Sequence, residues 1–301
     1  MNGRLPFVDT HVHFHDRTHP TLRYQWLEWD APLDEMVGEE GAIRSKHYRA
    51  EDFLAETRFQ NVKATIHVQA AVGSPDPVDE TRWLHEAYAR TSTPNAVIAA
   101  VDLASPDAAD TLARHLQFPL VRGIRDLRSD DYLSNPAWLR GYAAMEGYDL
   151  VCCDDPYIEQ MPLARRLAEE HPGVTLCIDH AAHPGFRGIP RQPSGGDNHW
   201  RDAIREVAKA ENVVIKMSGF GMSDRQWTPK AIRPWILECI EAFGTERAFF
   251  GTNWPLDRLY SSYGDVLDAY AAATADFTAK EREALFSGNA ERIFRIEGTN
   301  G

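Results

Sequence analysis

The chain has 301 residues and a formal net charge of −13, and 43% of its residues are hydrophobic. A chain of this length and composition is typical of a globular protein with a large buried core. The acidic excess disfavours nucleic acids and anionic membranes as partners, and no apolar run is long enough to span a membrane.

Eight short apolar segments alternate with helical patterns along the chain. We predict strands at about residues 7–8, 62–69, 95–103, 120–127, 148–153, 174–179, 212–218 and 247–252. This alternation is typical of a (β/α)8 TIM barrel, and we expect residues 1–301 to form a single domain with long first and sixth βα loops. A doubly wound open sheet is the alternative, but no glycine-rich phosphate turn follows the first strand.

The first connection, residues 15–48, is long and contains Tyr24, Trp26 and Trp29 close together. A long loop in a compact domain is typical of a lid or binding loop, and its aromatic residues argue against disorder. We predict that Tyr24 and Trp26 wall a substrate pocket, joined by Trp254 after the eighth strand. The alternative is that these rings only pack the loop onto the barrel.

Two histidines follow the first predicted strand, and a third ends the sixth. His11 and His13 are two residues apart, a spacing that points both imidazoles to one side of an extended backbone. His180 reaches the same place, because the C-terminal strand ends of a barrel meet at one mouth. Three imidazoles can hold one divalent metal such as zinc, or grip an oxyanion without a metal. We predict His11, His13 and His180 as metal ligands, with His13 also binding substrate and His180 also catalytic.

Further polar groups lie on other predicted strands. Gln69 ends the second strand, Arg122 and Arg125 belong to the fourth, and Lys216 lies in the seventh. We predict that all four bind substrate, and that Arg125 clamps a carboxylate with its planar fork. Two alternatives stay open, because Arg125 can pair with an acidic side chain and Lys216 can belong to a buried ion pair.

The four cysteines carry no recognisable framework. Cys152, Cys153, Cys177 and Cys239 lack both metal-knuckle and disulfide spacing, and we predict buried thiols. We expect no signal peptide, because no charged segment followed by an apolar core opens the chain. A reducing, cytoplasmic location is the expectation.

Several stretches resemble the amidohydrolase superfamily (amidohydrolase-related family 2), in particular its lactonase-like branch of sugar-acid lactonases and 2-pyrone-4,6-dicarboxylate lactonase. They are Asp9-Thr10-His11-Val12-His13-Phe14, Val121-Arg122-Gly123-Ile124-Arg125, Ile178-Asp179-His180, Lys216-Met217-Ser218-Gly219, Phe250-Gly251-Thr252-Asn253-Trp254-Pro255 and Gly288-Asn289-Ala290-Glu291-Arg292. The resemblance implies that water attacks the carbonyl of a lactone, that an acidic residue after the eighth strand is the base, and that imidazoles or a metal polarise the carbonyl.

The chain departs from this pattern at two places. The fifth strand ends in Cys153-Asp154 and offers no histidine, which disfavours a binuclear site. Asn253 stands where the superfamily usually has an aspartate, and an amide cannot accept a proton from water at neutral pH. The general base must then be Asp257 or His180, while Asn253 can orient the water or support an oxyanion.

We therefore predict a lactonase-type hydrolase of a small acidic or sugar-derived compound, acting with one divalent metal or without one. A decarboxylase or hydro-lyase on the same barrel is the alternative among enzymes. A binding protein that has lost its base is the alternative outside them. We expect a small, anionic substrate and neither nucleic acid nor membrane as partner; the sequence carries no signal for an oligomeric state.

Overall fold

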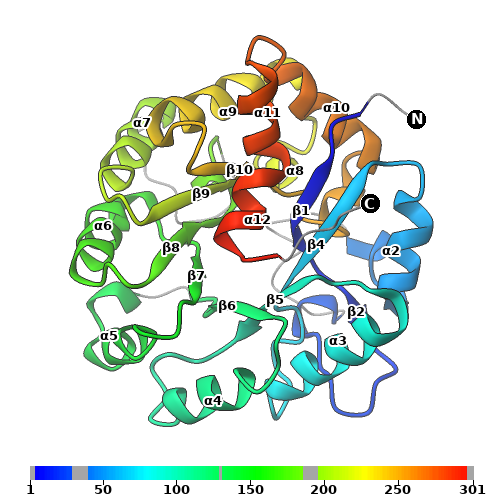
Figure 1. Cartoon of the computed structure of the whole chain (residues 1–301), viewed down its shortest axis with the longest axis vertical. Coiled ribbons are helices and arrows are strands. Elements are labelled where there is room, and N and C mark those ends of the chain that lie inside the picture. The colour runs from blue at the N-terminus through cyan, green and yellow to red at the C-terminus, as the bar shows by residue number, and fades with distance from the viewer. Residues whose placement is uncertain (1–3, 29–39, 129–130, 186–195, 297–301) are drawn as a thin grey trace.

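Eight parallel strands form the centre of the molecule and neighbour one another in chain order. The computed structural model describes residues 4–28, 40–128, 131–185 and 196–296. The strands are β1 (Phe7–Val12), β4 (Val62–Val68), β5 (Ala96–Ala100), β6 (Val121–Arg125), β7 (Val151–Asp154), β8 (Thr175–Ile178), β9 (Val213–Met217) and β10 (Ala248–Phe250). Figure 1 shows them as a ring, which confirms the predicted (β/α)8 barrel.

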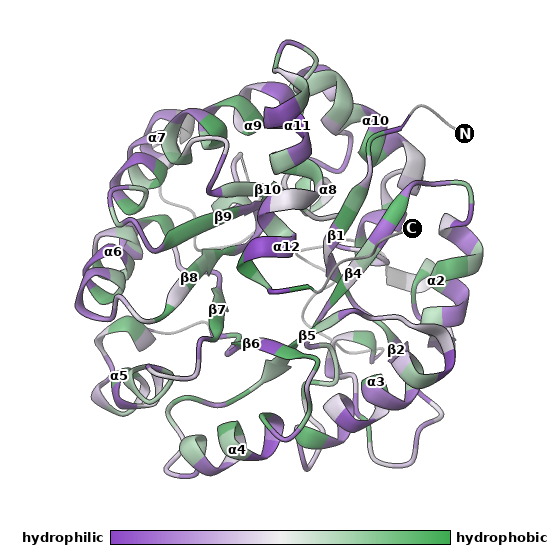
Figure 2. Ribbon diagram, in the orientation of Figure 1, coloured by the Kyte–Doolittle hydropathy of each residue, from purple (hydrophilic) through white to green (hydrophobic). Residues whose placement is uncertain are grey.

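Helices surround this ring, and Figure 2 shows polar residues on their outer sides and apolar residues along the strands. The helices are α2 (Ala50–Thr57), α3 (Val78–Thr91), α4 (Ala108–His115), α5 (Pro136–Ala143), α6 (Met161–Glu170), α7 (Gly196–Val207), α8 (Phe220–Ser223), α9 (Pro229–Phe243) and α10 (Tyr263–Ala273). In α9, Thr228 caps the first turn by accepting from Ala231 N, and Ile232, Ile236 and Ile240 recur every four residues on the buried side. None of the described helices is both long and apolar enough to cross a membrane.

The C-terminal segment closes the end of the barrel at which the strands begin. It consists of α11 (Ala279–Glu283), a π-helical turn (Ala284–Gly288) and α12 (Asn289–Ile293), and it lies across the ring in Figure 1. Phe294 packs edge-on against Phe249 of β10, and the Asn289 amide donates to the Thr245 and Ala248 carbonyls. The C-terminal segment therefore covers this end of the barrel. Among the described residues, the opposite end, where the strands finish, is the one accessible to a ligand.

Side chains join β1 to β10 where the ring closes. Thr252 donates to the Asp9 carboxylate from its backbone N at 2.9 Å and from Oγ1 at 2.6 Å, and the Tyr263 hydroxyl donates at 2.8 Å. Burial raises the pKa of Asp9 to about 6, although these hydrogen bonds act in the opposite direction. A backbone bridge between Val12 and Trp254 continues the seam, which thereby fixes the segment that carries the two histidines.

The first βα loop is anchored at both ends. Its β2 (His15–Asp16) pairs antiparallel with β3 (His47–Tyr48), and Arg49 Nη2 lies 2.7 Å from Asp16 Oδ2. Short 3₁₀ turns among the described residues are η1 (Gln25–Leu27), η2 (Glu40–Ala42), η3 (Tyr132–Ser134), η4 (Ile158–Gln160) and η6 (Leu256–Leu259), whereas η5 (Asp179–Ala182) contains left-handed backbone. Trp29 and most of the sixth loop lie outside the described residues.

Candidate active site

A cavity lies at the end of the barrel where the strands finish. It encloses about 600 Å³, including space open to solvent. Six of the residues predicted from the sequence line it: His13, Trp26, Gln69, Arg125, His180 and Asn253. Six others complete the lining: Val72, Leu127, Asp155, His183, Met222 and Leu256.

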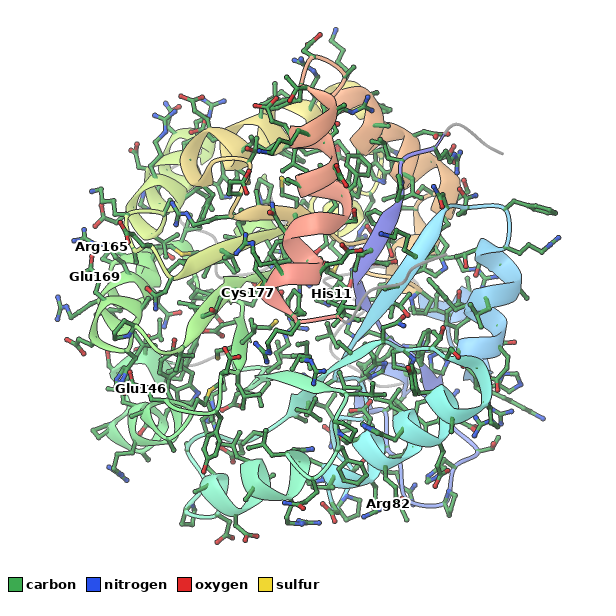
Figure 3. All side chains as sticks on the ribbon, in the orientation of Figure 1. His11, Arg82, Glu146, Arg165, Glu169 and Cys177 are labelled. Carbon is green, nitrogen blue, oxygen red and sulfur yellow. The ribbon has the colours of Figure 1, made fainter. Side chains whose placement is uncertain are left out.

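His11 and His13 point to the same side of β1, as their spacing predicts. Their Nε2 atoms are 3.1 Å apart, and Figure 3 shows His11 near the centre of the ring. His13 Nδ1 lies 2.9 Å from the Val68 carbonyl oxygen, so it carries the proton and leaves a lone pair on Nε2. Burial lowers the pKa of both imidazoles well below its ordinary value, with nearby cations adding to the effect. Both are therefore neutral at pH 7, the form that binds metals.

A left-handed turn aims two more histidines at the cavity. Residues 180–183 all have φ between 51° and 53°, although none is glycine. Such a conformation costs about 1–2 kcal/mol per residue and persists mainly at functional sites. His180 Nδ1 lies 3.0 Å from Ser218 Oγ, and His183 Nε2 lies 2.8 Å from Asp155 Oδ2. Because these partners fix both rings, the turn presents them together, with ring centroids 5.1 Å apart.

A buried charge network lies beneath these rings. Lys216 Nζ is 2.8 Å from Asp179 Oδ1, and Arg125 Nε is 3.4 Å from Asp179 Oδ2. Burial alone would lower the pKa of the Lys216 amine, but Asp179 and the neighbouring thiols outweigh it and raise that pKa. Lys216 is fully buried and does not line the cavity. It therefore belongs to the buried ion pair, and the expectation that it contacts substrate is corrected.

Three donors can hold one metal ion. His11, Asp179 and His180 each bring one ligand atom within 4.8 Å of the other two. His11 Nδ1 and Asp179 Oδ2 are buried, lie 3.8 Å apart and have no hydrogen-bond partner among the described residues. Two ligands of a tetrahedral zinc are roughly 3.3 Å apart, so these orphaned atoms fit one ion after a small adjustment. Asp179 joins this group without having been predicted, and His13 as a ligand stays a prediction, because its Nε2 lies 3.1 Å from His11 Nε2.

A second group of possible metal ligands lies next to the ammonium group of Lys216. Cys153, Cys177 and Asp179 also come within 4.8 Å of one another. However, Lys216 Nζ lies 3.6 Å from Cys153 Sγ as well as 2.8 Å from Asp179. Burial also raises the pKa of the Cys177 thiol well above its ordinary value, which keeps it protonated. A metal at this second group would have to displace the lysine.

Asn253 lies between Asp257 and the cavity. Its Nδ2 donates to Asp257 Oδ1 at 3.2 Å, and Asn253 itself lines the cavity whereas Asp257 does not. Burial raises the pKa of Asp257 to about 7, a value suited to a general base. The carboxyl nevertheless lacks access to a substrate in this arrangement.

Arg122 lies at the wrong end of the barrel for the role predicted from the sequence. It is the second residue of β6, and its guanidinium donates to the backbone carbonyls of Pro119 and Arg295. The expectation that it binds substrate is therefore corrected. Arg125 ends the same strand and does line the cavity.

Two predicted aromatic walls face elsewhere. Tyr24 is buried with its hydroxyl accepting from Asp16 N at 3.1 Å, and Trp254 donates from Nε1 to Glu56 Oε2 at 3.2 Å. Neither ring lines the cavity. Tyr24 follows the alternative, in which the ring packs the first loop onto the barrel, and the expectation that Trp254 walls the pocket is corrected. Trp26 does reach the cavity, and its Nε1 donates to the Ala70 carbonyl at 2.7 Å.

Three polar residues of the site were not assigned from the sequence. Asp155, Asp179 and His183 all follow strand ends, and that position was the available signal for them. The sequence pattern favours the adjacent His180 over Asp179 as the functional residue at this strand end. The contact between Asp155 and His183 depends on the left-handed turn, which no local pattern indicates.

Comparison with known proteins agrees with this geometry. Residues 8–296 match the sequence model of the amidohydrolase family. The chain belongs to the amidohydrolase family. This confirms the resemblance drawn from the sequence motifs.

Individual relatives match over most of this amidohydrolase. An uncharacterised protein of Sinorhizobium fredii is 32% identical and covers 97% of this chain and 99% of its own. An L-fucono-1,5-lactonase of Burkholderia ambifaria is 31% identical over 80% of this chain and 82% of its own. A crystal structure of an amidohydrolase from Burkholderia multivorans with bound zinc is 26% identical with a TM-score of 0.80, covering 96% of this chain and 99% of that one.

Asn253→Asp tests the pairing of Asn253 with Asp257 in this amidohydrolase. Burial raises the pKa of Asp257 to about 7. The new carboxyl at position 253 and Asp257 can therefore share one proton at pH 5, but this proton is lost as the pH rises. We expect the free energy of unfolding to fall little at pH 5 and by about 2–4 kcal/mol at pH 8. Urea denaturation at both pH values measures this, with Asn61→Asp at an exposed position as control. A larger loss at pH 5 than at pH 8 would contradict the pairing.

Proposed function

We propose that this amidohydrolase opens the lactone ring of a small acidic compound by hydrolysis. The observation that carries the proposal is a cavity where Arg125 meets three imidazoles at the strand ends. The similarity to the L-fucono-1,5-lactonase of Burkholderia ambifaria supports the same reaction class.

Arg125 is the proposed binding group for the substrate carboxylate. A guanidinium presents two parallel N–H groups, which match the two oxygens of a carboxylate. Asp179 and Asp155 lie 3.4 and 3.8 Å from the Arg125 nitrogens and hold the fork in place. A substrate bound in this way has its ring next to His13 and His180.

The lactone carbonyl needs a partner that stabilises the oxyanion. A metal, when bound by His11, Asp179 and His180, supplies a Lewis acid for this purpose. Asn253 supplies a hydrogen bond, because one of its two N–H groups donates to Asp257 and the other can face the cavity.

The proton of the attacking water goes to a histidine in this proposal. Asn253 cannot accept it, and Asp257 lies behind Asn253. His180 and His183 both line the cavity, and the Asp155 carboxylate 2.8 Å from His183 Nε2 orients that ring as a general base requires. When the ring C–O bond breaks, the same histidine gives this proton to the leaving alkoxide oxygen, and the ring-opened hydroxy acid leaves through the open end of the barrel.

A panel of lactones tests the proposal. Acid release in a pH-stat is measured with sugar-acid lactones, 2-pyrone-4,6-dicarboxylate and γ-lactones that carry a carboxymethyl arm. We expect turnover of at least one acidic lactone, with a hydroxy acid as product. Carbon dioxide release without ring opening would instead indicate a decarboxylase, and no turnover by folded protein would contradict the proposal.

Gly219→Ala tests whether the placement of His180 matters for turnover. A Cβ at Gly219 would lie 2.5 Å from His180 Nδ1, so we expect the ring to shift and kcat to fall at least about 10-fold. Gly244 also has a positive φ, but no atom lies within 4 Å of its added Cβ. Gly244→Ala should therefore cost roughly 1–2 kcal/mol of stability while kcat stays unchanged. Equal kcat values for the two variants would contradict the role given to His180.

A further inference from the structure

Five apolar side chains from five separate segments line the cavity, and together they are named its apolar rim. Trp26, Val72, Leu127, Met222 and Leu256 come from η1, the loop after β4, the loop after β6, α8 and η6, respectively. Leu127 stays 53% exposed, although it is a large apolar residue at the mouth. Single exposed leucines are common, but apolar side chains converging from five loops on one opening mark a surface for an apolar ligand.

Several polar groups of the cavity each donate or accept one hydrogen bond with a residue outside it. His13 Nδ1 is bonded to the Val68 carbonyl, His180 to Ser218, and Asn253 to Asp257. Among the described residues that line the cavity, the buried polar atoms without a hydrogen-bond partner include Gln69 Oε1 and Arg125 Nε. Arg125 Nε faces Asp179 Oδ2 at 3.4 Å, so the rest of the guanidinium and Gln69 Oε1 are left for a carboxylate and one further polar group.

A polyhydroxylated ring fits such a cavity poorly. Each hydroxyl needs its own donor and acceptor, and a hydroxyl buried without them is penalised. An alkyl or aromatic substituent has no hydrogen bond to lose when it is buried there. Each buried CH₂ group raises the binding constant about 4-fold. The cavity thus offers five apolar side chains to a substituent, beside the polar groups around Arg125.

We infer that the substrate is a lactone with an apolar alkyl or aryl substituent, which packs against the rim formed by Trp26, Val72, Leu127, Met222 and Leu256. Its carboxylate and carbonyl lie at the base of the cavity. This inference rests on the proposed lactone hydrolysis and narrows its substrate class away from sugar-derived lactones.

Four matched substrates test the inference on the wild-type protein. They are γ-lactones that share one carboxymethyl arm and carry hydrogen, butyl, phenyl or 1,2-dihydroxyethyl as a second ring substituent. We expect kcat/KM for the butyl and phenyl compounds to exceed that for the other two at least 30-fold. Equal values, or faster turnover of the dihydroxyethyl compound, would overturn the inference while leaving lactone hydrolysis intact. No turnover of any of the four, nor of any lactone in the wider panel, would instead count against the proposed hydrolysis.

Two leucine variants test whether the preference for an apolar substituent depends on the rim of the cavity. Leu127→Ser should lower kcat/KM for the butyl compound at least 5-fold and leave the dihydroxyethyl compound within 2-fold. Leu54→Ser changes a leucine that is 40% exposed on α2 and does not line the cavity, so it should change neither value. If Leu127→Ser affects both substrates equally, or if Leu54→Ser has the same effect, the rim does not contact the substituent.

Discussion

Lys216→Met should lower the free energy of unfolding by about 3–5 kcal/mol, because it leaves the buried Asp179 carboxylate without its nearest cation. Methionine fills nearly the same space, so loss of the charge dominates over loss of packing. Arg125 remains, but at 3.4 Å it makes no geometrically sound hydrogen bond to Asp179. Urea denaturation followed by circular dichroism measures the change.

Lys209→Met is the matched control for this experiment. Lys209 also pairs with an acidic residue, Glu206, but its side chain is 58% exposed. Exposed pairs contribute about 0–1 kcal/mol, so the control should lose no more than that. A loss below 1 kcal/mol for Lys216→Met would show that the network under the site does not depend on this lysine.

Arg125→Gln should lower kcat/KM for acidic lactones about 100- to 1000-fold, because the carboxylate of the substrate loses its charged partner. Arg125→Lys retains the charge but not the planar fork, and an intermediate loss is expected. The measurement compares initial rates for each variant, after circular dichroism has confirmed the folded state.

Arg122→Gln provides the control within the same strand. Its guanidinium contacts backbone carbonyls at the other end of the barrel, so kcat/KM should stay within 2-fold of the wild-type value. If Arg122→Gln loses as much activity as Arg125→Gln, the placement of Arg125 at the cavity and of Arg122 at the closed end of the barrel is contradicted.

The barrel and part of the site could be predicted because strand ends are visible in a sequence. The segment around β8 is apolar up to Ile178 and then turns polar at Asp179-His180, which marks both the element and its functional end. The spacing of His11 and His13 similarly predicts their shared direction, and their Nε2 atoms are 3.1 Å apart.

Position along a strand was harder to predict. The apolar pattern predicts one strand over residues 120–127 and does not by itself say which of its two arginines lies at the mouth of the barrel. Arg122 and Arg125 are three residues apart, which on a strand is roughly 10 Å. That distance separates the closed end of the barrel from the cavity. An odd spacing also points the two side chains to opposite faces of a strand, which is the signal that distinguishes them.

The left-handed turn at residues 180–183 could not be predicted at all. Alanine rarely adopts a positive φ, so Ala181 and Ala182 give no sign of the conformation. Without the turn, His183 has no reason to meet Asp155 from the end of the neighbouring strand. The pair follows from tertiary packing, which overrides the local preference.

Hydrolysis in ¹⁸O-labelled water tests the central claim most directly. The enzyme is mixed with its best acidic lactone under single-turnover conditions, and the product is analysed by mass spectrometry. Attack of water on the lactone carbonyl predicts one ¹⁸O atom in the new carboxylate of a ring-opened hydroxy acid. A product without ¹⁸O, or one that has lost carbon dioxide with its ring intact, would contradict lactone hydrolysis at this site.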